Sequence, residues 1–273
     1  MRSFADRVAV VTGAGGGIGR AVSLELARAG CHLAISDINE EALLGTAEEI
    51  RTLGRNVCTH RVDVSDKARM QAYVDEVVDF HGGVNILVNN AGVTVAAPFE
   101  DHTIEDWEWI VGINLWGVIY GTKFFLPHLK AADEAHVVNL SSVFGLAGIP
   151  AQTSYCVTKF AVRGLSEALW VELKKDNIGV TSIHPGGVRT DIAKSARTTD
   201  DPELKSQAVE IIERFSVTPE HCAKQIVKAI RKNKMRQLVT RESYLMDFLK
   251  RLSPVLPQRM LRAGYERNLI KGA

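Results

Sequence analysis

The amino-acid sequence predicts a doubly wound α/β fold, with a seven-stranded, mainly parallel sheet that carries helices on both faces. Short runs rich in Val, Ile and Leu alternate along the chain with longer amphipathic stretches, which is the element order of such folds. The short runs are apolar at successive positions, as strands buried on both sides must be. No shift in composition, Pro/Ser-rich linker or low-complexity segment divides the 273 residues, so we expect a single domain from 1 to 273.

Seven of the short runs are predicted to be strands, because apolar and β-branched residues fill a length typical of a strand. In chain order they are VAVVT (8–12), HLAIS (32–36), NVCTHRVDV (56–64), NILVNN (85–90), AHVVNLSS (135–142), GVTSIHP (179–185) and RQLVT (236–240). The longer stretches between them are predicted to be helices. These helices occupy 17–30, 40–53, 66–81, 103–129, 153–175 and 219–232.

Two regions depart from this alternation. Residues 190–217 follow a strand end and contain the polar stretch RTTDDPELKSQ, which is typical of a substrate lid. Residues 241–273 form a C-terminal extension that, from Tyr244 onward, carries six basic and two acidic residues. We expect this extension to pack over the substrate pocket or a neighbouring subunit, because Pro254 and Pro257 interrupt it and it has no Trp. Contact with an anionic membrane is the alternative.

Composition and charge exclude several classes of protein. Lys plus Arg number 33 and Asp plus Glu 32, a net charge of +1, which provides no basic surface for nucleic acid. The four cysteines are scattered without a C-x-x-C pair, so we expect free thiols and no zinc or other metal site. The first apolar run is too short for a signal peptide, and no apolar stretch approaches the roughly 20 residues of a membrane span. The sequence predicts a cytoplasmic protein.

The first turn of the predicted fold, TGAGGGIG at 12–19, has the chemistry of a phosphate site. Glycines between a strand and a helix let the backbone approach a pyrophosphate, whose charge the helix N-terminus favours. The spacing matches T-G-x-x-x-G-x-G and matches neither G-x-G-x-x-G nor the G-x-x-x-x-G-K-[ST] loop. A dinucleotide site is the functional interpretation; a flexible turn without a ligand is the structural alternative.

Asp37, at the end of the second predicted strand, favours NAD over NADP. A carboxylate about twenty residues beyond the glycines can accept hydrogen bonds from both adenosine ribose hydroxyls and would repel a 2′-phosphate. Gly16 and Ile38 offer no cation for a phosphate, although Arg20 and Arg61 remain candidates. Capping of the next helix is the alternative role of Asp37.

In combination, these features resemble the short, single-domain branch of the short-chain dehydrogenase/reductase family over roughly residues 5–240. Each motif alone is weak, and their order and positions at predicted strand ends make the resemblance specific. The motifs are Thr12-Gly13-x-x-x-Gly17-x-Gly19, Asp63-Val64, Asn89-Asn90-Ala91-Gly92, Asn114, Ser142, Tyr155-x-x-x-Lys159 and Pro185-Gly186. The resemblance implies a Rossmann-type sheet and a reaction with a nicotinamide dinucleotide.

The stretch SYCVTKF places a phenol and an ammonium one helical turn apart, on the same side of the predicted helix. A cation near Tyr155 would favour its phenolate and make it a usable acid/base. The resemblance implies that Tyr155 is the acid/base, Lys159 its electrostatic partner and Ser142 a hydrogen-bonding group. It implies that Asn114 supports a proton-relay water; a local side-chain-to-backbone bond that kinks the helix is compatible with that role.

The resemblance also implies a set of cofactor-binding residues. Asp63 would bond the adenine amino group beside the Val64 backbone, while the segment from Asn90 to Gly92 would line the ribose. Val188 and Thr190 would hold the nicotinamide carboxamide. The full expected set is Gly13, Gly17, Ile18, Gly19, Asp37, Asp63, Val64, Asn90, Ala91, Gly92, Tyr155, Lys159, Val188 and Thr190. His184 is interpreted as packed structure.

The expected activity is reversible oxidation of a secondary alcohol to a ketone with NAD. The apolar stretch VFGLAGI at 143–149 favours a hydrophobic substrate. An NADPH-dependent carbonyl reductase and a reductase of small, acetoin-like hydroxyketones remain alternatives. A non-catalytic dinucleotide-binding sensor or scaffold should lack Ser142, Tyr155 or Lys159, and none is missing. The apolar stripe on 153–175, like the resemblance, implies a homo-oligomer, a dimer or a tetramer.

Overall fold

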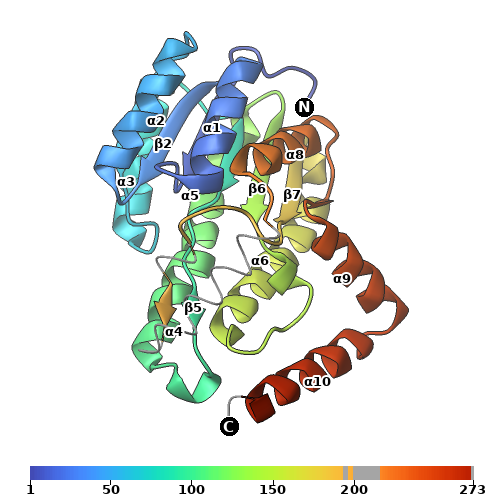
Figure 1. The fold of residues 1–273 in the computed structure, drawn as a ribbon. Coiled ribbons are helices and arrows are strands. Elements are labelled where there is room, and N and C mark those ends of the chain that lie inside the picture. Colours follow the sequence, from blue (N-terminus) through green and yellow to red (C-terminus); the bar gives the residue numbers. More distant parts are fainter. Residues whose placement is uncertain (193–195, 199–215, 272–273) are drawn as a thin grey trace.

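The structure, a computed structural model, describes residues 1–192, 196–198 and 216–271. Seven strands form one sheet in the order β3-β2-β1-β4-β6-β7-β9, and each neighbouring pair is parallel (Figure 1). The strands are β1 Val8–Thr12, β2 His32–Asp37, β3 Val57–Arg61, β4 Ile86–Asn89, β6 Ala135–Leu140, β7 Ile178–His184 and β9 Arg236–Leu238. The predicted doubly wound fold is therefore confirmed, with strand ends displaced by at most a few residues.

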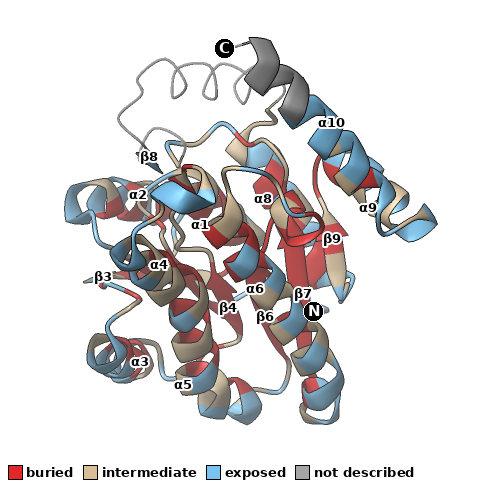
Figure 2. Cartoon of the chain, turned by 90° about the horizontal axis from the view of Figure 1, so that it is seen from below, coloured by how far each residue is buried: buried red, intermediate tan, exposed pale blue. Residues whose placement is uncertain are grey.

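Helices cover both faces of the sheet, so its central strands are buried throughout (Figure 2). In β1, Ala9 and Val11 face one hydrophobic cluster while Val8 and Val10 face the other. This alternation explains why the strands are apolar at every position. The helices are α1 Gly17–Ala29, α2 Glu40–Thr52, α3 Lys67–His81, α4 Ile104–Val111, α5 Gly117–Ala131, α6 Thr153–Glu172 and α8 Pro219–Arg231.

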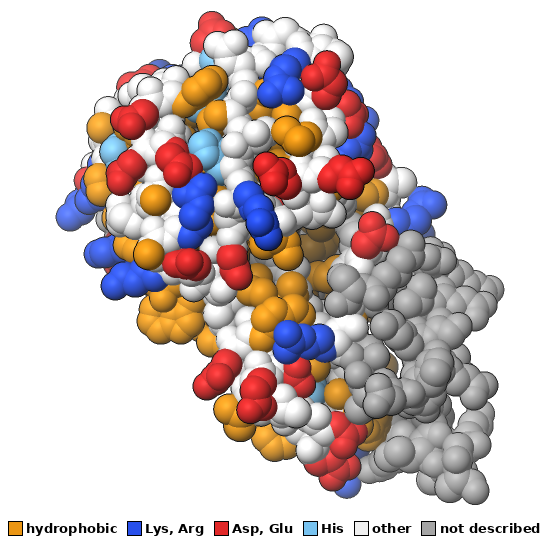
Figure 3. All heavy atoms as spheres, turned by 90° about the vertical axis from the view of Figure 1, so that its left-hand side faces the viewer, with side chains coloured by type: hydrophobic (Ala, Val, Ile, Leu, Met, Phe, Trp, Pro, Cys, Tyr) orange, Lys and Arg blue, Asp and Glu red, His pale blue; other side chains and the backbone are white. Residues whose placement is uncertain are grey.

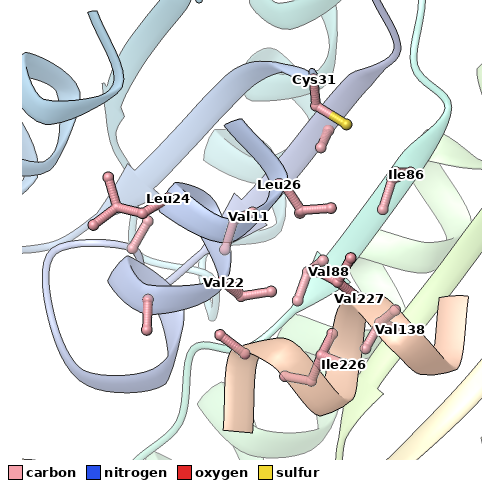
Figure 4. Close-up of a cluster of buried hydrophobic side chains, with 14 of the residues drawn as sticks. Val11, Val22, Leu24, Leu26, Cys31, Ile86, Val88, Val138, Ile226 and Val227 are labelled. Atoms are coloured by element: carbon pink, nitrogen blue, oxygen red, sulfur yellow. The ribbon is translucent and has the colours of Figure 1, made fainter. Parts of the chain in front are cut away.

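The first cluster is built mainly from β1, β4, α1, α2 and α8, and the second from α3, α5 and α6 packed on the opposite face. Figure 4 shows side chains of α1 and α8 meeting the strands, with Val22 and Leu26 on α1 and Ile226 and Val227 on α8. The carboxyl ends of these parallel strands lie at one edge of the sheet, where ligands bind in folds of this kind.

The long helix predicted at 103–129 is divided into α4, a π-helical turn at Gly112–Trp116 and α5. Within the described residues, one helical run, Ile104–Ala131, is long and apolar enough to cross a membrane by length and composition. The prediction that no apolar stretch approaches the length of a membrane span did not take this run into account. The run has 39% of its most apolar window buried. Ile110, Phe125 and Leu129 pack inside the protein, as in the core helix of a folded domain.

A small second sheet joins β5 (Val95–Ala96) to β8 (Arg197–Thr198), and the sequence did not predict it. Arg197 also stacks on Trp109, with its guanidinium carbon 3.8 Å from the ring centre, and pairs with Asp106 at 3.0 Å. Most of the lid predicted at 190–217 lies outside the described residues. The C-terminal extension forms α9 (Arg241–Leu252) and α10 (Leu256–Lys271).

Candidate active site

The glycine-rich turn between β1 and α1 has a backbone that larger residues would not allow. Gly13 and Gly17 have φ angles of +65° and +52°, in the left-handed region that favours glycine. A Cβ atom on Gly19 would overlap the carbonyl oxygen of Gly13, whereas one on Gly16 would meet nothing within 4 Å. Gly16 begins α1 without a side-chain cap, and Ile18 packs against the core. The first-turn amides therefore form a bare cradle suited to a pyrophosphate.

A network from β4 holds this turn in place. The amides of Asn90 and Ala91 each donate to the Thr12 hydroxyl at 3.1 Å, and the Asn90 side chain donates to the carbonyls of Thr12 and Gly13. The Asn90 side chain thus supports the glycine turn, a role that the sequence reading did not assign to it. Thr12, quoted only as part of the motif, is the other half of this support.

Asp37 lies beside the turn. Its carboxylate accepts hydrogen bonds from the amides of Gly15 at 2.8 Å and Asn39 at 3.0 Å. The capping residue of α2 is Asn39, whose side chain accepts from the Ala42 amide, so capping does not explain Asp37. The carboxylate is instead fixed at the carboxyl end of β2, where it can meet a ribose.

The two candidate phosphate-binding arginines differ in availability. Arg20 is held by Glu49 in a two-pronged ion pair, with contacts of 2.6 and 2.7 Å. Arg61 is exposed and is the register partner of Asp37 on β3. Of the two candidate arginines, Arg20 is thus engaged by Glu49, and Arg61 lies on the strand next to Asp37.

The next two predicted cofactor residues follow β3. Asp63 is exposed and accepts from the amide and hydroxyl of Ser65 through one oxygen, at 2.9 and 2.7 Å. Val64 is buried and belongs to the same cluster as Ala91. Asp63 thus lies at the same sheet edge as the glycine turn, as an adenine contact requires.

The predicted catalytic side chains converge next to this turn. Lys159 Nζ lies 5.3 Å from the ring centre of Tyr155, one turn away on α6. Ser142 begins a short 3-10 helix at Val143–Gly145, and its hydroxyl is close enough to the Tyr155 hydroxyl to lower the pKa of that group. A Cβ atom on Gly92 would stand 3.5 Å from Lys159 Nζ and 3.3 Å from Asn114 Oδ1. All four residues therefore surround one small region.

Burial, and not the nearby lysine, has the largest effect on the pKa of Tyr155 in the cofactor-free protein. Burial raises it to about 12, with the Ser142 hydrogen bond working in the opposite direction. Burial also lowers the pKa of Lys159 to about 8, and its ammonium donates to the Leu140 carbonyl at 2.9 Å. The prediction that Lys159 favours the phenolate concerns the site with NAD⁺ bound; without the cofactor, desolvation dominates. The lysine is near the ring but bound to the backbone.

Asn114 lies within the π-helical turn and is completely buried. Its side chain accepts from the Val93 amide at 2.8 Å and donates to the Val93 carbonyl at 2.9 Å. The anticipated local bond is therefore replaced by a long-range pair of hydrogen bonds that holds the segment between Gly92 and β5. The anticipated distortion of the helix is present as the π turn, a feature often found at functional sites.

The two serines at the end of β6 have different surroundings. The Ser141 hydroxyl donates to the Lys159 carbonyl at 2.8 Å, inside the contact between β6 and α6. Ser142 faces Tyr155, as expected. Behind Ser142, His184 Nδ1 contacts the Ser142 carbonyl oxygen at 2.9 Å and Nε2 contacts Ser182 Oγ at 2.9 Å. With the proton on Nδ1, the neutral ring fixes the Ser142 backbone, so His184 is a positioning residue.

We expect His184→Gln to flatten the dependence of stability on pH. Burial lowers the pKa of His184 to about 4. The unfolded state, with a pKa near 6.5, then binds more protons between these values, so stability is complete above about pH 6.5 and falls below it. The loss in the wild type reaches roughly 3 kcal/mol. Urea unfolding of the wild type and of His184→Gln, at neutral and at acidic pH, measures this loss of unfolding free energy. Equal losses in the two proteins would contradict a buried, neutral His184.

The segment after β7 is held by Thr240, which precedes α9, and by Glu242 of the C-terminal extension. Thr240 Oγ1 accepts from the Gly186 amide at 3.1 Å and the Glu242 carboxylate from the Gly187 amide at 2.9 Å. Thr190, beyond Val188, lies 2.9 Å from where a Cβ on Gly17 would be, so this segment reaches the glycine turn. No spacing in the sequence indicates these contacts, because they join residues more than fifty positions apart.

Comparisons with known proteins agree with this geometry. The family model described as short chain dehydrogenase matches residues 7–201. SadH of Mycobacterium tuberculosis, named as an oxidoreductase, is 39% identical over 267 residues, 97% of each chain. A 3-alpha-(or 20-beta)-hydroxysteroid dehydrogenase of Mycobacterium bovis is 37% identical over 184 residues, 67% of this chain and 70% of its own.

Solved structures give the same result. A short-chain dehydrogenase/reductase from Burkholderia phymatum in complex with NAD aligns with a TM-score of 0.87 at 30% identity, covering 94% of this chain and 97% of its own. A short-chain dehydrogenase from Mycobacterium paratuberculosis bound to NAD aligns with a TM-score of 0.78 at 27% identity, covering 88% and 98%. The chain belongs to the short-chain dehydrogenase/reductase family and is an NAD(P)-dependent oxidoreductase that acts on CH–OH donors.

Proposed function

We propose that this enzyme interconverts an apolar secondary alcohol and its ketone, with NAD as the preferred cofactor. The observation that carries the proposal is the convergence of Ser142, Tyr155 and Lys159 beside apolar side chains. Val93, Val95, Trp109 and Ile110 are among the apolar residues packed with Tyr155, and Phe144 meets its ring edge-on. Figure 3 shows hydrophobic side chains gathered across the middle of one face, between charged groups above and below.

The residues divide the reaction into separate tasks. Ser142 would hydrogen-bond the substrate oxygen and so place the substrate's hydroxyl proton at the Tyr155 oxygen, which would accept it as the phenolate during alcohol oxidation. A bound nicotinamide supplies the hydride acceptor. Lys159 and Asn114, both next to the bare backbone of Gly92, would organise the ribose side of the site. The cradle of Gly13, Gly17 and Gly19 would hold the pyrophosphate, and Asp37 the adenosine ribose.

Turnover of a graded panel of secondary alcohols tests the substrate class. With NAD⁺ in excess, we expect kcat/KM to rise about fourfold for each added methylene that the pocket buries, because each contributes about 0.8 kcal/mol. A maximum at the smallest hydroxyketones would favour the acetoin-like alternative. Tight NAD⁺ binding without turnover of any compound would favour the sensor alternative.

Replacing Asp37 by Ala tests the cofactor preference. We expect the wild type to bind NADH more tightly than NADPH, and the variant to lose about tenfold to a hundredfold in NADH affinity, since hydrogen bonds to a charged group contribute about 1.5–3 kcal/mol. Asp63→Ala is the matched control, because an adenine contact serves both cofactors alike. Dissociation constants measured by fluorescence titration decide the question, and equal wild-type affinities would refute the NAD assignment.

The enzyme is also proposed to be a homo-oligomer. On the outer side of α6, Val157, Phe160 and Val171 are 48%, 40% and 66% exposed. On neighbouring α5 and its π turn, Trp116, Tyr120 and Phe124 stack in a ladder with ring centres 5.5 and 5.7 Å apart. A second copy covering these helices would bury this surface. The molar mass from light scattering, in the wild type and in Phe160→Ser, tests the proposal.

A further inference from the structure

The C-terminal helices α9 and α10 leave a row of apolar side chains uncovered. Within the described residues, the large hydrophobic side chains that are exposed number nineteen, and eight of them lie between Tyr244 and Tyr265. We call seven of these the apolar ribbon. Its members, with exposed fractions from 40% to 66%, are Tyr244, Leu245, Phe248, Leu252, Val255, Leu256 and Met260. Such a concentration on one protein surface marks an interaction site.

The ribbon is a strip that follows the chain from α9 into α10. Leu245, Phe248 and Leu252 follow one another at helical spacing along α9, and Val255 and Leu256 carry the strip through the turn into α10. Both helices project from the body at its C-terminal end (Figure 1), and Figure 2 shows most of their described surface as exposed. The packing of α9 against the body therefore leaves its other face without a partner in the described residues.

The charges around the ribbon are mainly basic. Residues 241–262 contain five basic side chains and two acidic ones, whereas the whole chain has a net charge of only +1. Both acids are already engaged. Asp247 pairs with Arg236 at 2.9 Å and with Arg251 at 2.9 Å, and Glu242 accepts from the Gly187 amide. Residues 241–262 therefore carry a net charge of +3 by sequence, so this segment is positive.

The combination of exposed apolar side chains and basic residues favours one kind of partner over the others. A second copy docked symmetrically would place the same basic surface against itself, which is unfavourable. An anionic lipid surface satisfies both features, since the apolar side chains can enter the acyl boundary while Lys and Arg meet the headgroups. We propose that the apolar ribbon is the site at which this enzyme docks on an anionic membrane surface.

The docking site is connected to both sides of the catalytic pocket. At the start of α9, Thr240 and Glu242 hold the amides of Gly186 and Gly187, in the segment expected to contact the nicotinamide. On α10, Gln258 donates to the Gly148 carbonyl at 2.8 Å, in the apolar segment expected to flank the substrate. A docked ribbon would thus place the pocket next to the lipid phase in which an apolar alcohol dissolves. This last point rests on the proposed function, whereas the docking itself does not.

Flotation of the purified full-length protein with vesicles tests the proposal without any turnover. The vesicles consist of phosphatidylcholine alone or of phosphatidylcholine with phosphatidylglycerol. We expect binding to the anionic vesicles, weakened by high salt, and little binding to the neutral ones. The double variant Phe248→Ser/Leu252→Ser should lower the partition coefficient at least tenfold. Phe80→Ser is the matched control, because Phe80 on α3 is 58% exposed and lies far along the chain from the ribbon.

Each other outcome overturns the proposal. Failure of the wild type to bind anionic vesicles would do so, as would equal losses in the double variant and in Phe80→Ser, which would indicate unspecific adhesion. A wild-type oligomer that the double variant splits, without vesicle binding, would show that a second copy covers the ribbon. A separate control measures turnover of a water-soluble alcohol by the double variant. Unchanged turnover would show that the active site is intact, so that a loss of vesicle binding reports on docking and not on the proposed function.

Discussion

Replacing Tyr155 by Phe should lower kcat by about a thousandfold or more, because a positioned acid/base contributes that much to proton transfer. The change removes only the hydroxyl next to Ser142 and leaves the ring, which packs with Phe144 and the apolar pocket residues. The fold and the cofactor cradle should therefore persist. Steady-state rates with saturating NAD⁺ and alcohol, beside NAD⁺ affinity from titration, measure the two effects separately.

Tyr73→Phe is the matched control for this substitution. Tyr73 is a fully buried tyrosine on α3 whose hydroxyl contacts the Ala34 carbonyl at 3.4 Å, on the other side of the sheet from the glycine turn. It should retain turnover despite a small loss of stability. If Tyr155→Phe also kept its rate, the proton would have to travel by another group and the assigned acid/base would be wrong.

The pKa values of Tyr155 and Lys159 in the cofactor-free protein bear on how the catalytic base is formed. Tyr155 is held as the neutral phenol, with a pKa of about 12, and burial brings Lys159 to about 8. With so high a pKa, almost none of Tyr155 is phenolate at neutral pH, so the base form is scarce. Ionisation of Tyr155 would therefore depend on the positive charge of the oxidised cofactor, together with the hydrogen bond from Ser142.

Much of the fold could be predicted from the sequence because its signals are local. Strands that are apolar at every position and a glycine turn at the first strand end require no knowledge of distant contacts. The motif residues Ser142, Tyr155 and Lys159 could be found in the same way, since each lies at a fixed place relative to a predicted element. Their convergence in space follows from the parallel topology, which brings strand ends to one edge.

What could not be predicted depends on pairs distant in the sequence. The residues next to Arg20 in the sequence do not indicate that Glu49 pairs with it. Those next to Gly187 do not indicate that its amide donates to Glu242. The role of Asn90 in supporting the glycine turn and the bonds of Asn114 to Val93 are of the same kind. The high pKa of Tyr155 was missed because burial is a property of the packed protein, while the lysine that opposes it was visible in the motif.

The second large effect is expected at the glycine turn, from Gly19→Ala. A Cβ atom there would overlap the Gly13 carbonyl oxygen and stand 2.5 Å from Asn90 Nδ2, and both belong to the rigid support of the turn. Because backbone atoms cannot move aside as a flexible side chain can, the variant should lose about 3 kcal/mol or more of stability. The turn that remains should bind NAD⁺ at least a hundredfold more weakly, since its amides no longer converge.

Gly16→Ala separates this steric argument from a general requirement for glycine. Gly16 lies in the same turn, has an extended φ of −158°, and offers open space for a Cβ atom. Its replacement should cost less than about 1 kcal/mol, the value of a poorer helix cap, and should change NAD⁺ affinity only a few-fold. Denaturant unfolding and NAD⁺ titration of the two variants give the comparison. Equal losses in both would mean that flexibility of the turn, and not the close approach of Gly19 to Gly13, is what the cofactor site requires.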